Sequence, residues 1–264
     1  MLNVAGKVLD RLIADSIVHH VHTNAGLNSN QYGFIIQRGS VDAGMAFKEI
    51  IEENLKQKNC TSVVNLGVRG ESDAARWPRI LLNLKELKCS KNIFNLSRVY
   101  FSDRMASLRG NTLKTEKPVT LGCPKVSCSG PGFWNILYNT LLNMNFSYCT
   151  RAIAFAKDLM VITRRKSALD AENYANQDLK KIENWVRENK MNFNEKKSNV
   201  LLVTTKISGG NRNLNIYLNN KRLDQESEMK YLRIYFKSRI SFLQICRLYY
   251  REMQYYYKYV SKIS

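Results

Sequence analysis

Histidines, cysteines and a tyrosine- and lysine-rich tail are the parts of this 264-residue sequence that could carry chemistry. Imidazole is a common metal ligand, and His19, His20 and His22 lie close together. No cysteine or carboxylate accompanies them at ligand spacing, and a closed site needs four ligands, so a metal site is not favoured here. The six cysteines form no CxxC pair, which supports neither a zinc ribbon nor a redox motif. They are expected to be free thiols: Cys60, Cys89, Cys123, Cys128, Cys149 and Cys246.

The tail at 247–264 alternates aromatic and basic residues. Its tyrosines could stack on bases while its lysines hold phosphates. The alternative is a helix that packs its tyrosines on the domain or on a partner. We favour this alternative because aromatic stripes usually serve burial.

The elements that would position a site follow from the hydrophobic pattern. A first helix is predicted from two apolar rows, one at Val4, Val8 and Leu12 and the other at Leu9, Ile13 and Ile17. Ser167 and Asp170 form a weak capping box before the clearest helix of the chain. The further expectations are a strand at 61–68, a helix at 77–88, a helix at 133–142, strands at 150–156 and 159–163, a helix at 168–186 and a strand at 199–205.

The order strand, helix, hairpin, helix, strand fits a ferredoxin-like α+β sheet. Lys157-Asp158 joins the two strands of the hairpin tightly. In this topology the end of the first strand lies beside the hairpin turn. Gly67 and Lys157-Asp158 are therefore expected to face one site.

The charge indicates a polyanionic partner. Lys plus Arg total 41 against 22 Asp plus Glu, a formal net charge of +19, and such an excess favours nucleic acid through phosphate neutralisation. The alternative is a basic protein with no specific partner. No apolar run is long enough to span a bilayer, and the N-terminus lacks the apolar core and cleavage site of a signal peptide. We expect no membrane association and an intracellular protein, in the nucleus or cytoplasm and not secreted.

A series of short motifs runs through about residues 2–242. Its segments are LNVAGKVLDRLI at 2–13, QYGF at 31–34, RGSVDA at 38–43, Gly70 with Asp73 and Trp77-Pro78, LGCP at 121–124 with Gly130-Pro131 and Trp134-Asn135, FAKD at 155–158, Trp185 to Lys190 with Asn194 and Lys197-Ser198, and KYL at 230–232. In order and in rough spacing, the series resembles the reverse transcriptase of non-LTR retrotransposons, especially the R1 and Jockey-like elements of arthropods.

The resemblance implies a right-hand polymerase fragment with a ferredoxin-like palm sheet. We expect partial helical fingers at 1–60, the palm at 61–205, and a primer-grip and thumb remnant at 206–264. The implied activity is RNA-directed DNA synthesis on a template–primer of RNA and DNA. The implied primer-grip residues are Tyr231 and Leu232, and Lys197 matches the lysine that is implied to protonate pyrophosphate.

The departures from the family concern the implied Mg²⁺ ligands most of all. The family holds two Mg²⁺ ions with an aspartate on the first palm strand and the aspartates of a FADD turn. These positions fall at Gly67, Lys157 and Asp158, so that Asp158 alone is retained. Two unit charges about 4 Å apart interact by roughly 4 kcal/mol at an effective dielectric constant of 20, and Mg²⁺ carries two charges. Lys157 is therefore expected to oppose metal binding, and Asp158 alone is expected to be insufficient for it.

Other family positions are substituted as well. The aromatic residue that screens the nucleotide sugar falls at Ser72, and the Gln-Gly that lines the nucleotide pocket falls at Lys125-Val126. The basic residue after QYGF falls at Ile35, and the glycine of the KYLG motif falls at Arg233. The sequence thus suggests a reverse transcriptase domain without catalytic activity. The alternatives are a retained non-catalytic RNA- or DNA-binding module and a working polymerase with unusual ligands. Oligomeric state does not follow from the sequence.

Overall fold

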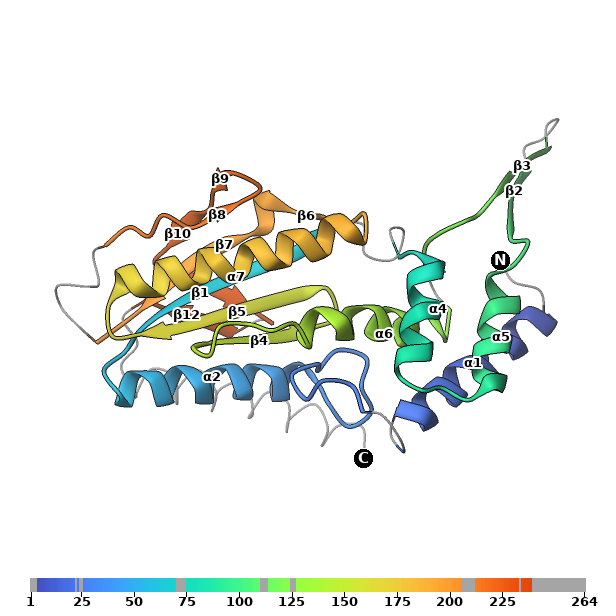
Figure 1. Cartoon of the computed structure of the whole chain (residues 1–264), viewed down its shortest axis with the longest axis horizontal. Helices are drawn as coiled ribbons and strands as arrows, with labels where there is room; N and C mark the ends of the chain where they lie inside the picture. The colour runs from blue at the N-terminus through green and yellow to red at the C-terminus, as the bar shows by residue number, and fades with distance from the viewer. Residues whose placement is uncertain are drawn as a thin grey trace, which may run out of the picture.

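The computed structural model describes residues 4–21, 23, 26–69, 75–109, 114–123, 127–205, 212–232 and 234–238. A six-stranded sheet lies between two long helices on opposite faces, α7 (Ala168–Glu188) and α2 (Ser40–Lys56) (Figure 1). Helix α6 (Gly130–Leu142) leads from the sheet toward a group of three helices. These are α1 (Val4–His20), α4 (Trp77–Glu86) and α5 (Lys91–Phe101).

The sheet has the strand order β10-β7-β1-β5-β4, and β6 pairs with β1 beside this path. Strands β7, β1, β5 and β4 pair antiparallel throughout, whereas β10 adds to β7 in parallel. Counted along the chain, the four antiparallel strands lie in the order fourth, first, third, second, which is the ferredoxin-like arrangement. This confirms the expected α+β fold. The bounds are β1 (Cys60–Arg69), β4 (Thr150–Phe155), β5 (Asp158–Arg165), β6 (Asn192–Phe193), β7 (Asn199–Val203) and β10 (Asp224–Glu226).

The sheet is apolar on both faces because its strands alternate between two hydrophobic cores. On β1, Val64 and Leu66 belong to the larger core, which includes side chains of α1, α4, α5, α6 and α7. Val63 belongs to the smaller core, where Phe47 and Ile51 of α2 are fully buried. Helix α2 was not predicted from the sequence, and it covers this face of the sheet together with Met229, Tyr231 and Phe236.

Helix α7 begins as the sequence predicts. The Ser167 side chain accepts a hydrogen bond from the Asp170 backbone N–H at 3.1 Å and donates to the Asp170 carboxylate at 2.7 Å. The first helix, α1, also forms, but its two apolar rows have different environments. Ile13 and Ile17 are buried, whereas Val4, Val8 and Leu12 are exposed.

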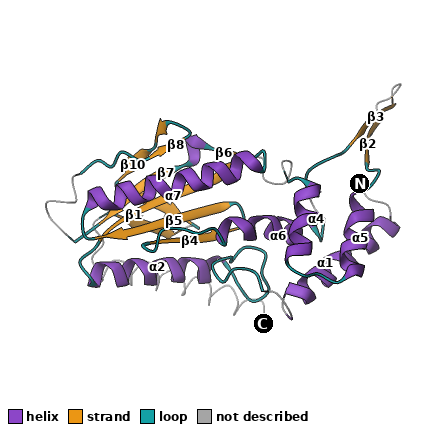
Figure 2. Cartoon of the chain, viewed as in Figure 1, coloured by secondary structure: helices purple, strands orange, loops and turns teal. Residues whose placement is uncertain are grey.

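Smaller elements complete the described chain. Strands β2 (Met105–Arg109) and β3 (Lys114–Pro118) form a hairpin that projects from the helical end (Figure 2). A 3₁₀ helix, η2 (Glu195–Lys197), precedes β7. The remaining strands form two short hairpins: β8 (Tyr217–Leu218) with β9 (Lys221–Arg222), and β11 (Glu228–Tyr231) with β12 (Ile234–Lys237).

Within the described residues, no helix is both long enough and apolar enough to cross a membrane. The five cysteines in this part of the chain are free, as expected, and Cys246 lies outside it. Burial raises the pKa of the Cys123 thiol to about 12 and that of Cys89 to about 11. These two thiols are therefore poor nucleophiles at neutral pH.

Candidate functional site

The end of strand β1 and the β4–β5 turn meet at one place. Gly67 lies directly opposite Asp158 in the antiparallel β1–β5 register. One residue further along, the Val68 backbone N–H donates to the Lys157 carbonyl at 3.4 Å. The structure therefore brings Gly67, Lys157 and Asp158 together, as the strand order predicted.

Lys197 joins this group from η2. The Asn194 backbone N–H donates to the Gly67 carbonyl at 2.7 Å, and the Lys197 N–H donates to the Asn194 carbonyl at 2.9 Å. These bonds hold η2 against the end of β1, so that a Cβ built on Gly67 would lie 3.8 Å from the Lys197 Cβ. An aspartate side chain at position 67 would thus project beside Lys197.

The electrostatics of the group centre on Asp158, which is half-buried. Burial raises the pKa of the Asp158 carboxyl, while the charges of Lys157 and Lys197 act in the opposite direction and lower it. Both lysines are exposed. Two ammonium groups thus flank one carboxylate, which gives the site a net positive charge.

The donor set does not fit a pair of Mg²⁺ ions. Mg²⁺ needs hard oxygen ligands in near-octahedral geometry. The position opposite Asp158 is a glycine, and the residue before Asp158 on the turn is a lysine. Throughout the described part of the chain, no group of three or more His, Cys, Asp or Glu side chains could hold a metal ion.

The β4–β5 turn itself is tight. Phe155 pairs with Asp158, which leaves Ala156 and Lys157 as a two-residue loop. Strand β5 therefore begins at Asp158, one residue earlier than the sequence predicted. Ala156 has φ of +54°, and a positive φ at the first loop residue is typical of a type II′ hairpin turn.

The segment 30–34 holds this turn from outside the sheet. The Ala154 N–H donates to the Asn30 carbonyl at 2.9 Å, and the Tyr32 N–H donates to the Ala154 carbonyl at 2.9 Å. Gly33 lies so close to the turn that an added Cβ would come within 2.1 Å of the Ala156 backbone nitrogen. A side chain at position 33 would therefore displace the turn.

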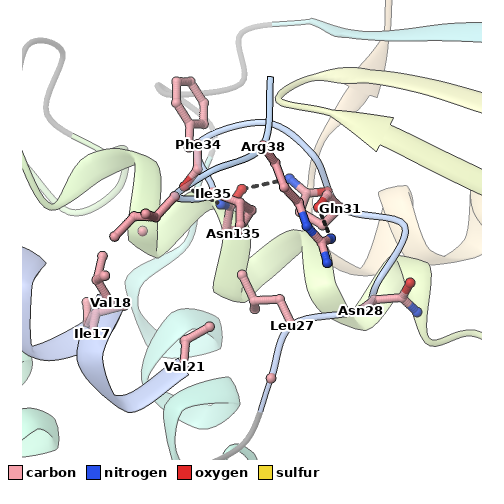
Figure 3. Close-up of a pocket in the computed structure, with 13 residues that line it drawn as sticks. Ile17, Val18, Val21, Leu27, Asn28, Gln31, Phe34, Ile35, Arg38 and Asn135 are labelled. Carbon is pink, nitrogen blue, oxygen red and sulfur yellow. Dashed lines mark hydrogen bonds between the residues drawn. The ribbon is translucent and has the colours of Figure 1, made fainter. Parts of the chain in front are cut away.

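Trp134 and Asn135 at the start of α6 tie the same parts together. The Trp134 indole N–H donates to the Ala156 carbonyl at 3.0 Å. The Asn135 amide donates to the Gly33 carbonyl at 3.0 Å and to the Phe34 carbonyl at 3.3 Å. Its Oδ1 accepts from Gln31 Nε2 at 2.7 Å (Figure 3). These bonds give a physical role to two motifs that the sequence offered only as resemblances.

Asp10 is a positioning residue that the sequence analysis missed. Its carboxylate is 3% exposed and accepts from the Tyr100 hydroxyl at 2.9 Å, from the Cys128 N–H at 2.7 Å and from the Ser129 N–H at 3.3 Å. The Ser129 hydroxyl also donates to it. Asp10 therefore links α1 to the chain that enters α6. The sequence feature that could have identified it is an acidic residue between Leu9 and Ile13, on the side of the helix that faces the core.

Tyr231 and Leu232 lie at the β11–β12 hairpin. Tyr231 is 2% exposed and packs on Phe47 of α2, with ring centroids 5.7 Å apart. Burial first, and then the charges of Asp158 and Tyr32, raise the pKa of its hydroxyl. Leu232 is half-buried with φ of +48°. Because Tyr231 is buried, its ring stabilises the hairpin from within and is not presented on the surface.

Other sequence-predicted positions lie outside the described residues. These are Ser72, Lys125, Val126, Gly70, Asp73, Arg233 and the tail at 247–264. Of the three histidines, His20 is buried and lies 3.0 Å, through Nε2, from the Leu87 carbonyl oxygen, whereas His22 lies outside the described part.

The ferredoxin-like sheet and the strand end opposite a tight hairpin turn define the palm of a right-hand polymerase. Solved structures with this fold include telomerases. Apo telomerase from Candida tropicalis superimposes with a TM-score of 0.58 at 8% identity, over 88% of this chain and 39% of that one. Telomerase from Candida albicans in complex with a fragment of telomeric RNA superimposes with a TM-score of 0.54 at 11% identity, over 91% of this chain and 40% of that one. At such low identity the likeness shows the fold alone.

Residues 1–236 match the family model of reverse transcriptase (RNA-dependent DNA polymerase), and the chain belongs to this family. Its relatives come from non-LTR retrotransposons. A putative 115 kDa protein of the type-1 element R1DM of Drosophila melanogaster is 30% identical over 70% of this chain and 17% of its own length. The Pol polyprotein of the R1 element of Bradysia coprophila is 26% identical over 92% of this chain and 24% of its own length. The RNA-directed DNA polymerase of the mobile element jockey from Drosophila funebris is 23% identical over 92% of this chain and 27% of its own length.

These matches confirm the predicted R1- and Jockey-like family. The chain spans between about a sixth and about a quarter of the length of these relatives.

Proposed function

We propose that this chain binds RNA or DNA at the end of its palm sheet, where strand β1 meets the β4–β5 turn, without catalysing DNA synthesis. The observation that carries the proposal is the pairing of Gly67 with Asp158 while Lys157 occupies the adjoining turn. A polymerase of this family would have a carboxylate at each of the three positions. Here one carboxylate lies between two lysines. Electrostatics favours a phosphate over a divalent cation at such a place.

In this proposal Lys157 and Lys197 contact backbone phosphates directly. Burial disfavours the ionised form of Asp158, and the two lysines only partly offset this effect. The proposal implies no resident Mg²⁺ and an intracellular location, in the nucleus or cytoplasm. It retains the division into partial fingers at 1–60, palm at 61–205, and a primer-grip and thumb remnant at 206–264.

Salt dependence tests the binding. A labelled template–primer should bind without divalent metal, and its affinity should fall steeply between 50 and 200 mM salt. Replacing Lys157 and Lys197 with Met should lower the affinity and make the plot of log K against log salt less steep by about one unit for each lost phosphate contact. The pair Lys56→Met and Lys88→Met provides a matched control. An affinity that ignores salt would contradict the proposal.

Primer extension tests the absence of catalysis, and no product should form with Mg²⁺ or Mn²⁺. The double variant Gly67→Asp with Lys157→Asp should regain metal binding, seen as a rise in Tm with Mg²⁺ that the unmodified chain lacks. It should remain a poor polymerase, because the substitutions at Ser72, Lys125 and Val126 are still present and catalytic groups act as a unit. Robust extension by the unmodified chain would overturn the proposal. No metal-linked rise in the folded double variant would show that position 67 or 157 is wrongly assigned.

A further inference from the structure

The molecule has a mostly apolar pocket beside the palm site, between the C-terminal half of α1, the segment 26–38 and the start of α6 (Figure 3). It encloses about 230 Å³. Pockets that take drug-sized molecules are typically about 300–1,000 Å³, so this one suits a single small ring system. The lining side chains are mainly aliphatic, among them Val18, Val21, Leu27 and Ile35.

One of the lining residues carries a buried polar atom that lacks a partner. Gln31 lines the pocket and is 1% exposed, and its Oε1 has no hydrogen-bond partner. An unsatisfied buried acceptor is costly unless a ligand or water supplies a donor. This atom thus marks a place where a donor is needed.

The hydrogen-bond network fixes this atom as an acceptor. The Asn135 amide nitrogen donates to two backbone carbonyls, Gly33 and Phe34, so its Oδ1 must face Gln31. Gln31 must then present Nε2 to Asn135, at 2.7 Å, which leaves Oε1 unpaired. Exchanging O and N in Gln31 would place two acceptors against each other.

We infer that this pocket accepts an unpaired nucleobase of a bound nucleic-acid strand, with Gln31 Oε1 accepting a hydrogen bond from a base N–H. This inference rests on the proposed binding function and names what one part of the site recognises. A base is a flat, largely apolar ring system that carries N–H donors at its edge, which suits aliphatic walls with one buried acceptor. Single-stranded bases are commonly recognised by such edge contacts.

The surroundings suit a strand that continues past the pocket. Arg38 lines it, is exposed, and stacks over Tyr32 at 5.4 Å. Its guanidinium can contact a phosphate next to the inserted base. The Phe34 ring is 59% exposed and points away from the pocket interior in Figure 3, where a neighbouring base could stack on it. Through Gly33 the same segment touches the β4–β5 turn.

The test uses the full chain and short single-stranded oligonucleotides, RNA and DNA in parallel, that differ at one central position. That position carries adenine, purine or an abasic site. Adenine should bind about 3- to 10-fold more tightly than purine, because purine lacks the exocyclic N–H group, and the abasic strand should bind more weakly still. The variant Gln31→Met should remove the difference between adenine and purine.

A second pair of variants tests the pocket itself. Val18→Phe places a larger side chain in the pocket and should make the adenine and abasic strands bind equally. Val8→Phe places the same side chain on the exposed row of the same helix and should leave their difference unchanged. Circular dichroism and melting curves check that each variant folds.

The outcomes separate the two proposals. Adenine, purine and abasic strands that bind the unmodified chain equally, with normal salt dependence, would overturn the pocket and leave the binding function intact. This result needs no variant, so a misfolded mutant cannot hide it. No binding of any strand at low salt would overturn both proposals. If the Val18→Phe variant preferred the adenine strand over the abasic strand as strongly as the Val8→Phe variant does, the recognised base would bind elsewhere.

Discussion

Gly33 and Gly67 lie on either side of the β4–β5 turn, and the space around them differs. A Cβ on Gly33 would come within 2.1 Å of the Ala156 backbone nitrogen, whereas a Cβ on Gly67 would meet nothing nearer than the Lys197 Cβ at 3.8 Å. Close packing thus requires glycine at position 33. At position 67 the fold allows a side chain, and the chain has none.

The same contrast extends to the residues around each glycine. The Trp134 side chain donates to the Ala156 carbonyl, and the Asn135 side chain donates to the carbonyls of Gly33 and Phe34, so loss of either side chain would leave backbone carbonyls without their partner. Lys157 is displayed outward and contributes little to the core. The contacts that hold the β4–β5 turn, which form its frame, and the side chains that the turn exposes are therefore under separate physical constraints. A chain of this family can keep the frame while its displayed residues change.

The largest expected effect comes from Gly33→Ala. The added methyl group meets backbone atoms, which cannot rotate away, so the variant should lose at least about 3 kcal/mol of unfolding free energy or fail to fold. Gly67→Ala provides the matched comparison and should change it by no more than about 0.5–1 kcal/mol, with a gain expected because alanine restricts the unfolded chain. Urea denaturation measures both. Similar losses in the two variants would refute the contrast.

A smaller loss should follow from Asn135→Ala. The change leaves the carbonyls of Gly33 and Phe34 and the amide of Gln31 without their partner inside the protein. Buried groups left unpaired in this way cost about 2–3 kcal/mol in total. Asn92→Ala, at an exposed helical position, should stay within about 0.5 kcal/mol. A stability loss in the Asn135 variant no greater than in this control would show that the frame does not depend on the amide.

Much of the fold could be predicted from the sequence because its elements have clear local signals. The apolar spacing of α7, the β-branched run of β1 and the tight turn after β4 each determine an element without help from distant residues. Their order then gives the strand arrangement and the meeting of Gly67 with Asp158. The proximity of Gly67, Lys157 and Asp158 was predictable to the same extent, because the strand order places the end of β1 beside the tight β4–β5 turn, whereas the roles of these residues stay predictions.

Other features depend on contacts between distant segments and escaped prediction. Helix α2 was not predicted although Ala43, Phe47 and Ile51 follow helical spacing; what the sequence could not show is its distant partner, Phe236 of the β11–β12 hairpin, whose ring centroid lies 4.5 Å from that of Phe47. The unpaired acceptor of Gln31 follows from the direction in which Asn135, 104 residues away along the chain, points its amide. The burial of Tyr231 was missed for the same reason, because a strand of a few residues gives no periodicity from which to judge which side faces the core.

The smallest expected effect is a pH dependence at Asp158, and it concerns the displayed residues rather than the frame. Burial raises the pKa of this carboxyl in the folded state above its ordinary value, although Lys157 and Lys197 lower it. As pH rises from about 3, the unfolded chain therefore releases this proton before the folded chain does, and folded stability falls across the interval between the two pKa values. The loss is constant at higher pH.

Asp158→Asn removes this titration, because the amide stays neutral. The variant should have a higher Tm than the unmodified chain at pH 7, and the difference should shrink toward zero near pH 3. Lys197→Met provides a second readout. Removing a positive charge that lowers the Asp158 carboxyl pKa should raise that pKa further. The stability that the folded chain loses between pH 3 and pH 7 through this carboxyl should then be larger. A difference in Tm that does not change with pH would show that Asp158→Asn acts through packing. A lower Tm for Asp158→Asn at pH 7 would show that the two lysines outweigh burial, and that the charge of Asp158 stabilises the folded palm.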